Sequence, residues 1–277
     1  MLTARSQRVR EARALRRRAI REKRGLFLAE GPQAVREALA KPYLVSEVFA
    51  TPDAASRHAE LLDTASGSVQ LADDEALASL SETVTPQGLV AVCHLLTVPL
   101  AQALRSAPKL VTVLVEVRDP GNAGTVIRCA DAAGADAVVF AGDSVDPHSG
   151  KCVRATAGSL FHLPIVGVID VADVVDSLRK RGMTLLAADG AGPTDLDEAA
   201  DTGLLAGSTA WLFGNEAHGL PTAVVKSADR AVRVPIHGQA ESLNLATAAA
   251  ICLYASARAH RPLIMGRADA RPGAAPS

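Results

Sequence analysis

Polar side chains that can bind a ligand follow apolar runs at several places in the chain. The runs occupy residues 111–117, 211–213 and 230–234, and each leads into a loop rich in Gly, Asn or Ser. The polar residues in and after these loops include Asn122, Arg128, Glu216, Ser242 and Asn244. Because ligands of open parallel sheets bind at the carboxyl ends of the strands, we expect these segments to share one crevice. Such a set of side chains can orient a polar substrate and stabilise the charge that develops on it.

The last of these loops leads into a helix that is expected to be mostly covered. From Leu243 to Ala257, small apolar residues recur at helical spacing, and alanines fill the positions between them. A helix that is apolar nearly all round is buried on most sides. Ser242 and Asn244 can cap this helix or meet a ligand, so the loop is either a simple helix start or part of a site.

Length and charge describe the chain as a whole. Its 277 residues are 48% hydrophobic, enough for one large or two ordinary domains. Residues 1–24 hold ten Lys or Arg against two Glu, a balance of 10 − 2 = +8, and the remaining residues carry 19 − 28 = −9. A basic end on an acidic body is typical of a protein that binds a polyanion. The alternative is a solvated terminus.

Several classes of protein are disfavoured by what the sequence lacks. No signal peptide and no apolar run of about 18 residues occur, so we expect a cytoplasmic protein without a membrane partner. The cysteines form no CxxC pair and the histidines show no ligand spacing, so no metal is expected. Because the GxGxxG and P-loop fingerprints are absent, a nucleotide-like cofactor must be held in another way.

The first part of the chain predicts a small α/β domain over residues 1–97. A basic helix is expected over 6–24, because no Gly or Pro interrupts this run of good helix formers. Gly25 is expected to end it. The strands are expected at 25–31, 45–50, 69–71 and 89–95, and the other helices at 32–39, 54–62 and 73–80. Pro99 and Pro108 mark residues 98–109 as a linker.

Residues 110–262 predict a second α/β domain, a mostly parallel sheet with helices on both faces. Its strands are expected near 110–117, 136–141, 163–168, 183–188, 208–213 and 230–234. Its helices are expected near 123–133, 149–157, 170–181, 221–227 and 243–259. Residues 263–277 have the composition of a disordered tail.

Three ordered motifs resemble those of the SpoU/TrmH family of SPOUT RNA methyltransferases, and the resemblance covers about residues 110–260. The motifs are Asn122-x-Gly124-x-x-x-Arg128, Phe213-Gly214-Asn215-Glu216-x-x-Gly219-Leu220 and Ser242-Leu243-Asn244. The first domain is similar, at 27–32 and 85–88, to the ribosomal-protein-like RNA-binding domain that precedes many SpoU enzymes. The resemblance also implies a deep trefoil knot near the C-terminus.

The cofactor implied by the resemblance is S-adenosylmethionine. Family members hold it mainly through main-chain groups, and the matching positions are Ala188, Gly214, Val234, Ile236 and Leu243. Gly214 is the most informative of them, because a residue without Cβ permits a close approach. For Val234, Ile236 and Leu243, packing in the core is an equal alternative.

The acceptor implied by the resemblance is a ribose 2′-hydroxyl of RNA. Arg128 is then either the base or, since an arginine stays protonated, a stabiliser of the oxyanion and of the adjacent phosphate. Asn122 is expected to cap the helix and orient Arg128, while Glu216 fixes the guanidinium or binds backbone amides. Ser242 and Asn244 would position the hydroxyl or the methionine end of the cofactor. The alternative for Arg128 is an ordinary surface arginine.

RNA contacts are expected from exposed cations, because few aromatic residues are present for stacking. The candidates are Arg16, Arg17, Arg18, Lys151 and Arg154. The resemblance favours ribosomal over transfer RNA and implies a homodimer in which the Ala-rich helix contributes to the interface. A silent RNA-binding protein on the same fold and an unrelated nucleotide-dependent reductase remain as alternatives, which the intact motifs and the missing GxGxxG disfavour.

Overall fold

The N-terminal half is built on a four-stranded sheet. The computed structural model describes residues 1–65 and 69–260, so the predicted tail at 263–277 lies outside the described residues. The strands are β1 (Leu26–Glu30), β2 (Val45–Ala50), β3 (Val69–Leu71) and β4 (Leu89–His94), in the order β1-β4-β2-β3. Helices α3 (Pro32–Leu39), α4 (Pro52–Arg57), α5 (Ala59–Asp63) and α6 (Asp74–Leu80) and the 3-10 turn η1 (Pro42–Leu44) connect them. The predicted strands of this half are therefore confirmed.

The single helix predicted over 6–24 is wrong, because the chain breaks into α1 (Gln7–Ala14) and α2 (Arg18–Arg24). Between the helices, Nη1 of Arg21 donates to the carbonyl oxygens of Leu15 at 2.9 Å and Arg16 at 2.8 Å. Carbonyls that accept from this buried guanidinium turn away from a continuous helical ladder. The predicted end is confirmed, since Gly25 follows α2 in the left-handed region with φ 66°.

The C-terminal half is built on a seven-stranded sheet in the order β7-β6-β5-β10-β8-β11-β9, in which every pair is parallel. Its strands are β5 (Leu110–Val115), β6 (Ala137–Ala141), β7 (Ile165–Ile169), β8 (Thr184–Ala188), β9 (Thr194–Asp195), β10 (Thr209–Phe213) and β11 (Arg230–Arg233). All residues of β5, β6 and β10 are buried, as expected of central strands covered on both faces. The short strand β9 was not predicted.

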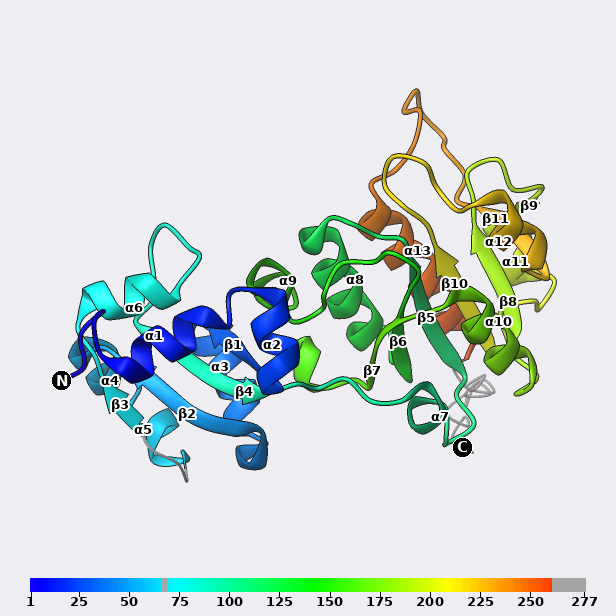
Figure 1. The fold of residues 1–277 in the computed structure, drawn as a ribbon. Helices are drawn as coiled ribbons and strands as arrows, with labels where there is room; N and C mark the ends of the chain where they lie inside the picture. The colour runs from blue at the N-terminus through cyan, green and yellow to red at the C-terminus, as the bar shows by residue number, and fades with distance from the viewer. Residues whose placement is uncertain (66–68, 261–277) are drawn as a thin grey trace, which may run out of the picture.

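Helices cover both faces of this sheet (Figure 1). One face carries α8 (Pro120–Ala132), α9 (Gly150–Ala155), α11 (Leu196–Asp201), α13 (Leu245–Ala259) and the 3-10 turn η2 (Ser159–Phe161). The other face carries α7 (Leu100–Ala103), α10 (Val171–Arg179) and α12 (Thr222–Ser227). The predicted α/β class with a large parallel sheet is therefore confirmed. Among the described residues, no helix is long and apolar enough to cross a membrane.

The two halves lie side by side and share part of one apolar core (Figure 1). The ring of Phe27 in β1 lies 4.7 Å from that of His148 and 6.1 Å from that of Phe161, measured between centroids. Arg21 donates through Nε to Asp146 at 2.9 Å, so an ion pair accompanies the apolar contact. The predicted linker at 98–109 also packs on the larger sheet, since it contains α7 and since Leu104 is only 2% exposed.

Candidate active site

The start of α8 is fixed by Asp119, which follows β5 by a short loop. Its carboxylate accepts from the backbone N–H of Asn122 at 2.8 Å, and Pro120 occupies the first helical turn. The prediction that Asn122 caps this helix is therefore wrong, because Asp119 is the cap. Lys151 donates to the second oxygen of Asp119 at 2.8 Å, and this bond together with the Asn122 amide lowers the pKa of the carboxyl. The side chain of Asn122 is thereby left for other partners.

Asn122 lies at the centre of a hydrogen-bonded relay that joins the three motifs. Nδ2 of Asn244 donates to Oδ1 of Asn122 at 3.1 Å, and Nδ2 of Asn122 donates to Oε1 of Glu216 at 3.2 Å. The direction of the relay is fixed at both ends. The Glu216 oxygen accepts from Asn122, and Oδ1 of Asn244 accepts from the N–H groups of Ala246 and Thr247 where it caps α13. Residues far apart in the sequence are thus held in one orientation.

Glu216 also closes the loop between β5 and α8. Its oxygens accept from the backbone N–H groups of Arg118 at 3.4 Å and Asp119 at 3.3 Å. Of the two roles predicted for Glu216, the structure shows the binding of backbone amides. Because its oxygens are engaged by backbone donors and by Asn122, Glu216 holds its neighbours in position and organises the site.

The loop after β10 is closed on itself by Asn215, which the sequence reasoning did not select as a site residue. Asn215 and Gly219 exchange backbone hydrogen bonds of 3.0 Å and 2.8 Å, and Nδ2 of Asn215 donates to the carbonyl oxygen of Glu116 at 2.8 Å. Glu116 has φ 54°, an unfavourable backbone conformation for a residue with Cβ. The position of Asn215 in the motif, next to Gly214 at a strand end, is the signal that could have identified it.

Gly214 is required by a close approach within the protein itself. A Cβ built on Gly214 would lie 2.2 Å from the carbonyl carbon of Gly219 and 2.3 Å from the nitrogen of Leu220. The close approach of the cofactor to Gly214 stays a prediction, whereas the neighbour that the structure shows close to Gly214 is the backbone of the same loop.

A surface groove of about 750 Å³ opens at these loops. Its lining residues are Glu116, Arg118, Asp119, Asn122, Asn215, Glu216, Ala217, His218, Gly219 and Pro221. The groove therefore joins the first and second motifs, and Asn244 reaches its wall through Asn122. It is the kind of concave, polar-edged site in which a substrate is positioned.

Two predicted catalytic residues lie outside this relay. Arg128 is on α8, about 9 Å further along the helix axis than Asn122 at 1.5 Å per residue. It is exposed and has no hydrogen bond or ion pair with any residue of 1–65 or 69–260. Ser242 is also exposed, in the loop before α13. The structure of a single chain thus brings together Asn122, Glu216 and Asn244 and leaves Arg128 pointing to solvent.

Three of the predicted cofactor positions lie close together at the carboxyl ends of adjacent strands. Strands β10, β8 and β11 are neighbours and run parallel, so Gly214, Ala188 and Val234 lie at or just beyond adjacent carboxyl ends. Ile236 is a large apolar side chain that remains 39% exposed, and Leu243 is half-buried before α13. Main-chain groups at a strand edge, with small and apolar residues around them, fit an adenosine moiety.

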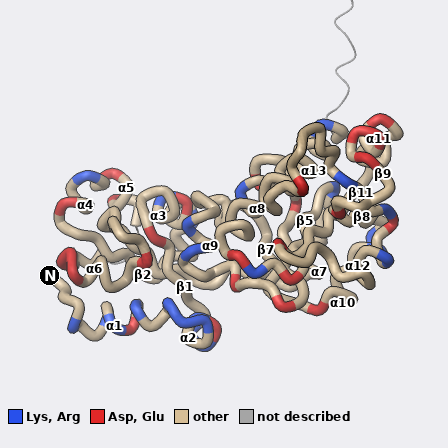
Figure 2. Tube along the Cα trace, turned by 90° about the horizontal axis from the view of Figure 1, so that it is seen from above, with Lys and Arg blue, Asp and Glu red and all other residues tan. Residues whose placement is uncertain are grey.

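Four of the predicted RNA contacts lie in ion pairs within the protein. Lys151 pairs with Asp119 at 2.8 Å, Arg18 with Glu22 at 2.7 Å, Arg16 with Glu82 at 3.5 Å and Arg154 with Glu30 at 3.0 Å. Arg17 is exposed and has no such partner among the described residues. The basic residues nevertheless concentrate along α1 and α2, as Figure 2 shows.

The cysteines and acidic residues give no sign of other chemistry. The four cysteines are free, and burial raises the pKa of the Cys93 and Cys252 thiols to about 12, which makes them unreactive. In the described part of the chain, no group of three or more His, Cys, Asp or Glu residues is arranged to hold a metal ion.

Solved structures place this fold in a class, that of RNA methyltransferases that use S-adenosylmethionine. The crystal structure of an AdoMet-bound rRNA methyltransferase from Sinorhizobium meliloti matches 93% of this chain and 97% of its own, with a TM-score of 0.79 at 29% identity. The SpoU methyltransferase AviRb from Streptomyces viridochromogenes, in complex with AdoMet, matches 92% of this chain and 98% of its own, with a TM-score of 0.79 at 30% identity.

The chain belongs to the SpoU rRNA Methylase family, whose model matches residues 109–254. An MRM3-like substrate binding domain matches residues 6–91. The 23S rRNA (guanosine(2553)-2′-O)-methyltransferase RlmP of Bacillus subtilis (strain 168) is 36% identical over 255 residues, which are 91% of this chain and 96% of that protein. The predicted family, the enzyme class and the cofactor S-adenosylmethionine are thereby confirmed.

Proposed function

We propose that this chain transfers a methyl group from S-adenosylmethionine to the 2′-hydroxyl of a ribose in 23S rRNA. The observation that carries the proposal is the relay from Asn244 through Asn122 to Glu216, which holds the three family motifs in one place. The Bacillus subtilis relative, which is similar over both halves of the chain, is named for this reaction on 23S rRNA. Transfer RNA, the alternative substrate, becomes an outcome of the test below.

The cofactor would lie at the carboxyl ends of the neighbouring strands β8, β10 and β11. Ala188, Gly214 and Val234 would offer main-chain groups there, and Ile236 and Leu243 an apolar cover. When bound, S-adenosylmethionine supplies an electrophilic methyl group. Burying the 39% exposed Ile236 against an adenosine would favour binding through the hydrophobic effect.

The residues of this chain would prepare the ribose hydroxyl for attack. A hydroxyl is a weak nucleophile, so charge that develops on its oxygen must be stabilised. Arg128 stays protonated, so its role would be to hold this oxygen and a neighbouring phosphate while the proton leaves to water or a phosphate oxygen. Asn122 and Asn244 would orient the acceptor ribose. Ser242, which is exposed in the same loop as Asn244, would contact it through its side-chain hydroxyl.

Methyl transfer from labelled S-adenosylmethionine tests the proposal. We expect label in the 2′-O-methyl group of one 23S rRNA ribose and none in tRNA. Arg128→Ala is expected to lower the single-turnover rate about a hundred- to a thousand-fold, as loss of one electrostatic donor does, with cofactor affinity within a few-fold. Arg57→Ala is the matched control, because Arg57 is an exposed arginine whose ion pair within residues 1–65 and 69–260 is the local one with Asp53. A silent RNA-binding protein would yield no label at all, and transfer to tRNA alone would replace the substrate.

We also propose that the active form is a homodimer. Arg128 is exposed on α8 and lies outside the groove of its own chain, which fits a role in the site of a second copy. On α13, which packs against α8, Ile251 is 39% and Tyr254 53% exposed, and these apolar side chains would be covered at an interface. We expect a dimer at micromolar concentration in sedimentation, and Tyr254→Glu should yield an inactive monomer. An active wild-type monomer would contradict the proposal.

The remaining proposals concern organisation. We infer an RNA-binding domain at 1–97 and a methyltransferase domain at 110–262, supported by the separate family matches at 6–91 and 109–254. The trefoil knot stays a prediction from the family resemblance. We place the protein in the cytoplasm, where ribosomal RNA is accessible to it.

A further inference from the structure

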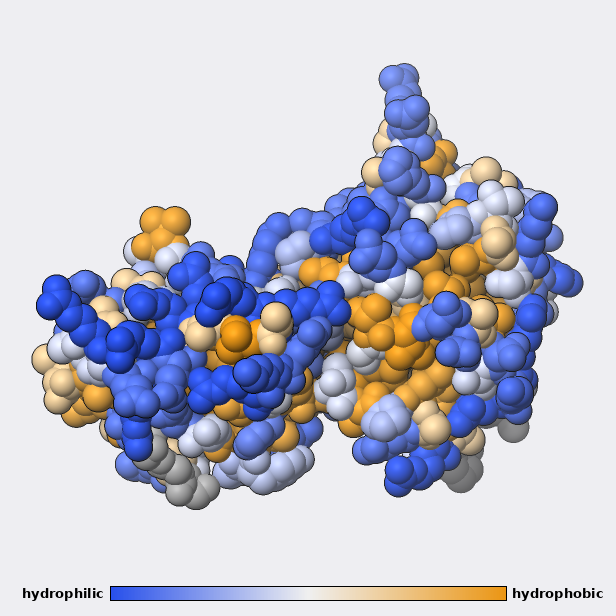
Figure 3. Space-filling model, viewed as in Figure 1, coloured by the Kyte–Doolittle hydropathy of each residue, from blue (hydrophilic) through white to orange (hydrophobic). Residues whose placement is uncertain are grey.

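A second groove, of about 530 Å³, runs along the C-terminal end of α1 and the turn before α2. It is lined by Arg10, Arg13, Ala14, Arg16, Arg17 and Glu82, a charge of 4 − 1 = +3. Arg10, Arg13 and Arg17 are exposed, and within residues 1–65 and 69–260 none of them forms an ion pair. Hydrophilic side chains gather over α1 and α2 on this face (Figure 3). We call this surface the arginine groove.

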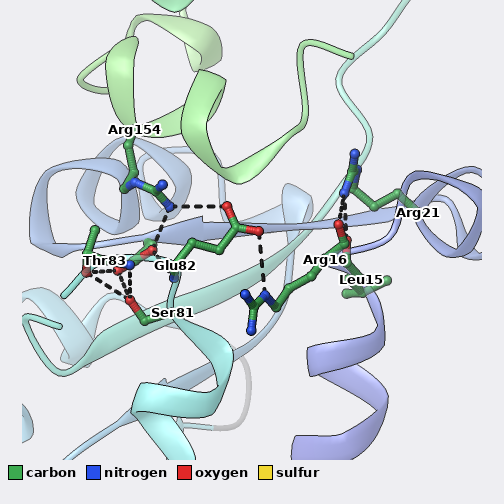
Figure 4. Close-up of polar contacts among 8 residues, drawn as sticks. Leu15, Arg16, Arg21, Ser81, Glu82, Thr83 and Arg154 are labelled. Atoms are coloured by element: carbon green, nitrogen blue, oxygen red, sulfur yellow. Dashed lines mark hydrogen bonds and ion pairs between the residues drawn. The ribbon is translucent and has the colours of Figure 1, made fainter. Parts of the chain in front are cut away.

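The acidic residue of the arginine groove stands between two arginines from different halves of the chain. Glu82 lies 3.5 Å from Nε of Arg16 and 3.6 Å from Nη1 of Arg154, and Figure 4 shows its carboxylate between the two guanidiniums. A Cβ on Gly150 would lie 2.5 Å from Oε2 of Glu82, so the carboxylate also rests against the start of α9. Glu82 thus occupies a compact anion position with cations on two sides.

The two arginines differ in how firmly they are held. Arg154 also donates to Glu30 at 3.0 Å, and the Glu30 side chain is only 10% exposed. Burial alone would raise the pKa of the Glu30 carboxyl, but hydrogen bonds from Ser81 and Thr83 and the charge of Arg154 lower it by more, so the net shift is downward. The carboxyl is therefore ionised and keeps Arg154 in place. Arg16 has Glu82 as its only acidic partner in the described residues, and its side chain is 43% exposed.

The arginine groove connects to the methyl-transfer site along the surface. A narrow cleft that contains Arg16 and Glu82 continues to Gly150 and Arg154. The next residue after Gly150 is Lys151, which donates to Asp119 in the wall of the groove at the relay. A nucleic acid strand that follows the arginines therefore meets cations at each step toward Asn122.

We propose that the arginine groove binds the phosphodiester backbone of the substrate RNA, and that Glu82 occupies in the free protein the position that a phosphate takes in the complex. This inference rests on the proposed function, since it names how the same substrate is held. A phosphate and a carboxylate bind guanidinium groups through the same geometry, so a phosphate can replace Glu82 between Arg16 and Arg154. Glu82 keeps both arginines oriented before RNA arrives and weakens binding by competing for them.

The salt dependence of RNA binding tests this exchange directly. Affinity for a 23S rRNA fragment is measured without methyl donor over a range of salt concentrations, for Glu82→Gln and for Asp53→Asn as the matched control. Asp53 pairs with Arg57 on α4, and Arg57 is not one of the arginines expected to contact RNA, so both variants remove one negative charge from the N-terminal half but only Glu82→Gln releases a groove arginine. Each added phosphate contact steepens the slope of log affinity against log salt by about 0.7–0.9. We expect Glu82→Gln to bind several-fold more tightly at low salt with a slope steeper by about one to two, and Asp53→Asn to leave the slope unchanged.

Two further variants locate the effect. Arg16→Gln combined with Glu82→Gln is expected to lose most of the gain, because the arginine released by Glu82→Gln is then missing. Arg13→Gln alone is expected to flatten the slope by about one, since Arg13 faces the groove without an acidic partner in the described residues.

Equal slopes for Glu82→Gln, Asp53→Asn and the wild type would overturn the inference, as would an unchanged slope in Arg13→Gln. These outcomes are separable from the proposed function, because binding is measured without methyl transfer. If the wild type methylates rRNA but Glu82→Gln leaves the salt slope of RNA binding unchanged, only the role of Glu82 is refuted. If the salt slopes are as expected but the protein transfers no methyl group, only the enzymatic proposal is refuted.

Discussion

Replacing Gly214 by Ala is expected to distort the loop at the centre of the site. The added Cβ would lie 2.2 Å from the Gly219 carbonyl carbon, whereas ordinary contacts begin at 3.4 Å, so the backbone must move by 3.4 − 2.2 = 1.2 Å. The backbone segments on the two sides of this contact are held together by the hydrogen bonds of 3.0 Å and 2.8 Å that Asn215 and Gly219 exchange. Movement of this size therefore breaks or strains both bonds.

The expected cost of Gly214→Ala follows from these contacts. Overpacking costs about 1–3 kcal/mol, and two weakened backbone hydrogen bonds add about 1 kcal/mol each. Restricting the unfolded chain returns about 0.4–1 kcal/mol. The free energy of unfolding should then fall by roughly 2–4 kcal/mol, which lowers Tm by roughly 5–15 °C in a chain of this size.

Thermal unfolding and calorimetric titration with S-adenosylmethionine measure the two consequences. Gly207→Ala is the control, because a Cβ there meets nothing within 4 Å. We expect Gly207→Ala to behave like the wild type and Gly214→Ala to be less stable and to bind the cofactor more weakly. If Gly214→Ala matched Gly207→Ala in both measurements, the close approach of the loop would not be what requires glycine.

Two other predictions concern the relay and the contact between the halves. Asn244→Asp keeps the cap of α13 but removes the donor to Asn122, so the rate of methyl transfer should fall while Tm stays unchanged. Asn244→Ala removes the cap as well, so it should also lower the free energy of unfolding by about 1 kcal/mol. Equal Tm values for the two variants would speak against the capping role. His162 bonds to Asp131 and Glu37, which raise the pKa of its imidazole above the usual 6.5. Its contribution is therefore complete below the usual pKa and is lost as pH rises through the raised one. In urea unfolding, His162→Gln should be less stable than the wild type at about pH 5.5, and the difference should shrink as the pH rises through the raised pKa. A pH-independent difference would contradict this.

Local patterns were sufficient to predict most elements of the fold. The β-branched run that became β5 and the helix stop at Gly25 depend on neighbours in the sequence, so their bounds were predicted to within a few residues. Helix α11 had a similar local signal that was missed, since Asp195 caps it and Glu198 follows three residues later.

Contacts between distant residues account for what could not be predicted. The break between α1 and α2 depends on Arg21, which pairs with Asp146 at a separation of 125 residues. The capping of α8 by Asp119 left Asn122 to meet Asn244, 122 residues away, and no periodicity in the sequence records this pairing. The motifs identified the residues of the relay, but the direction of their hydrogen bonds required the fold.

The charges that join the two halves limit how this enzyme can be recombined with its relatives. Arg21 and Glu30 come from the N-terminal half, and their partners Asp146 and Arg154 from the C-terminal half. The side chains of Arg21 and Asp146 are 6% and 13% exposed, and removing one partner of a buried pair costs about 3–5 kcal/mol. A chimera that exchanges residues 1–97 for those of another methyltransferase must therefore import both partners of each pair. An exchanged N-terminal half is therefore expected to pack stably on this C-terminal half only when Asp146 and Arg154, or their equivalents, accompany it.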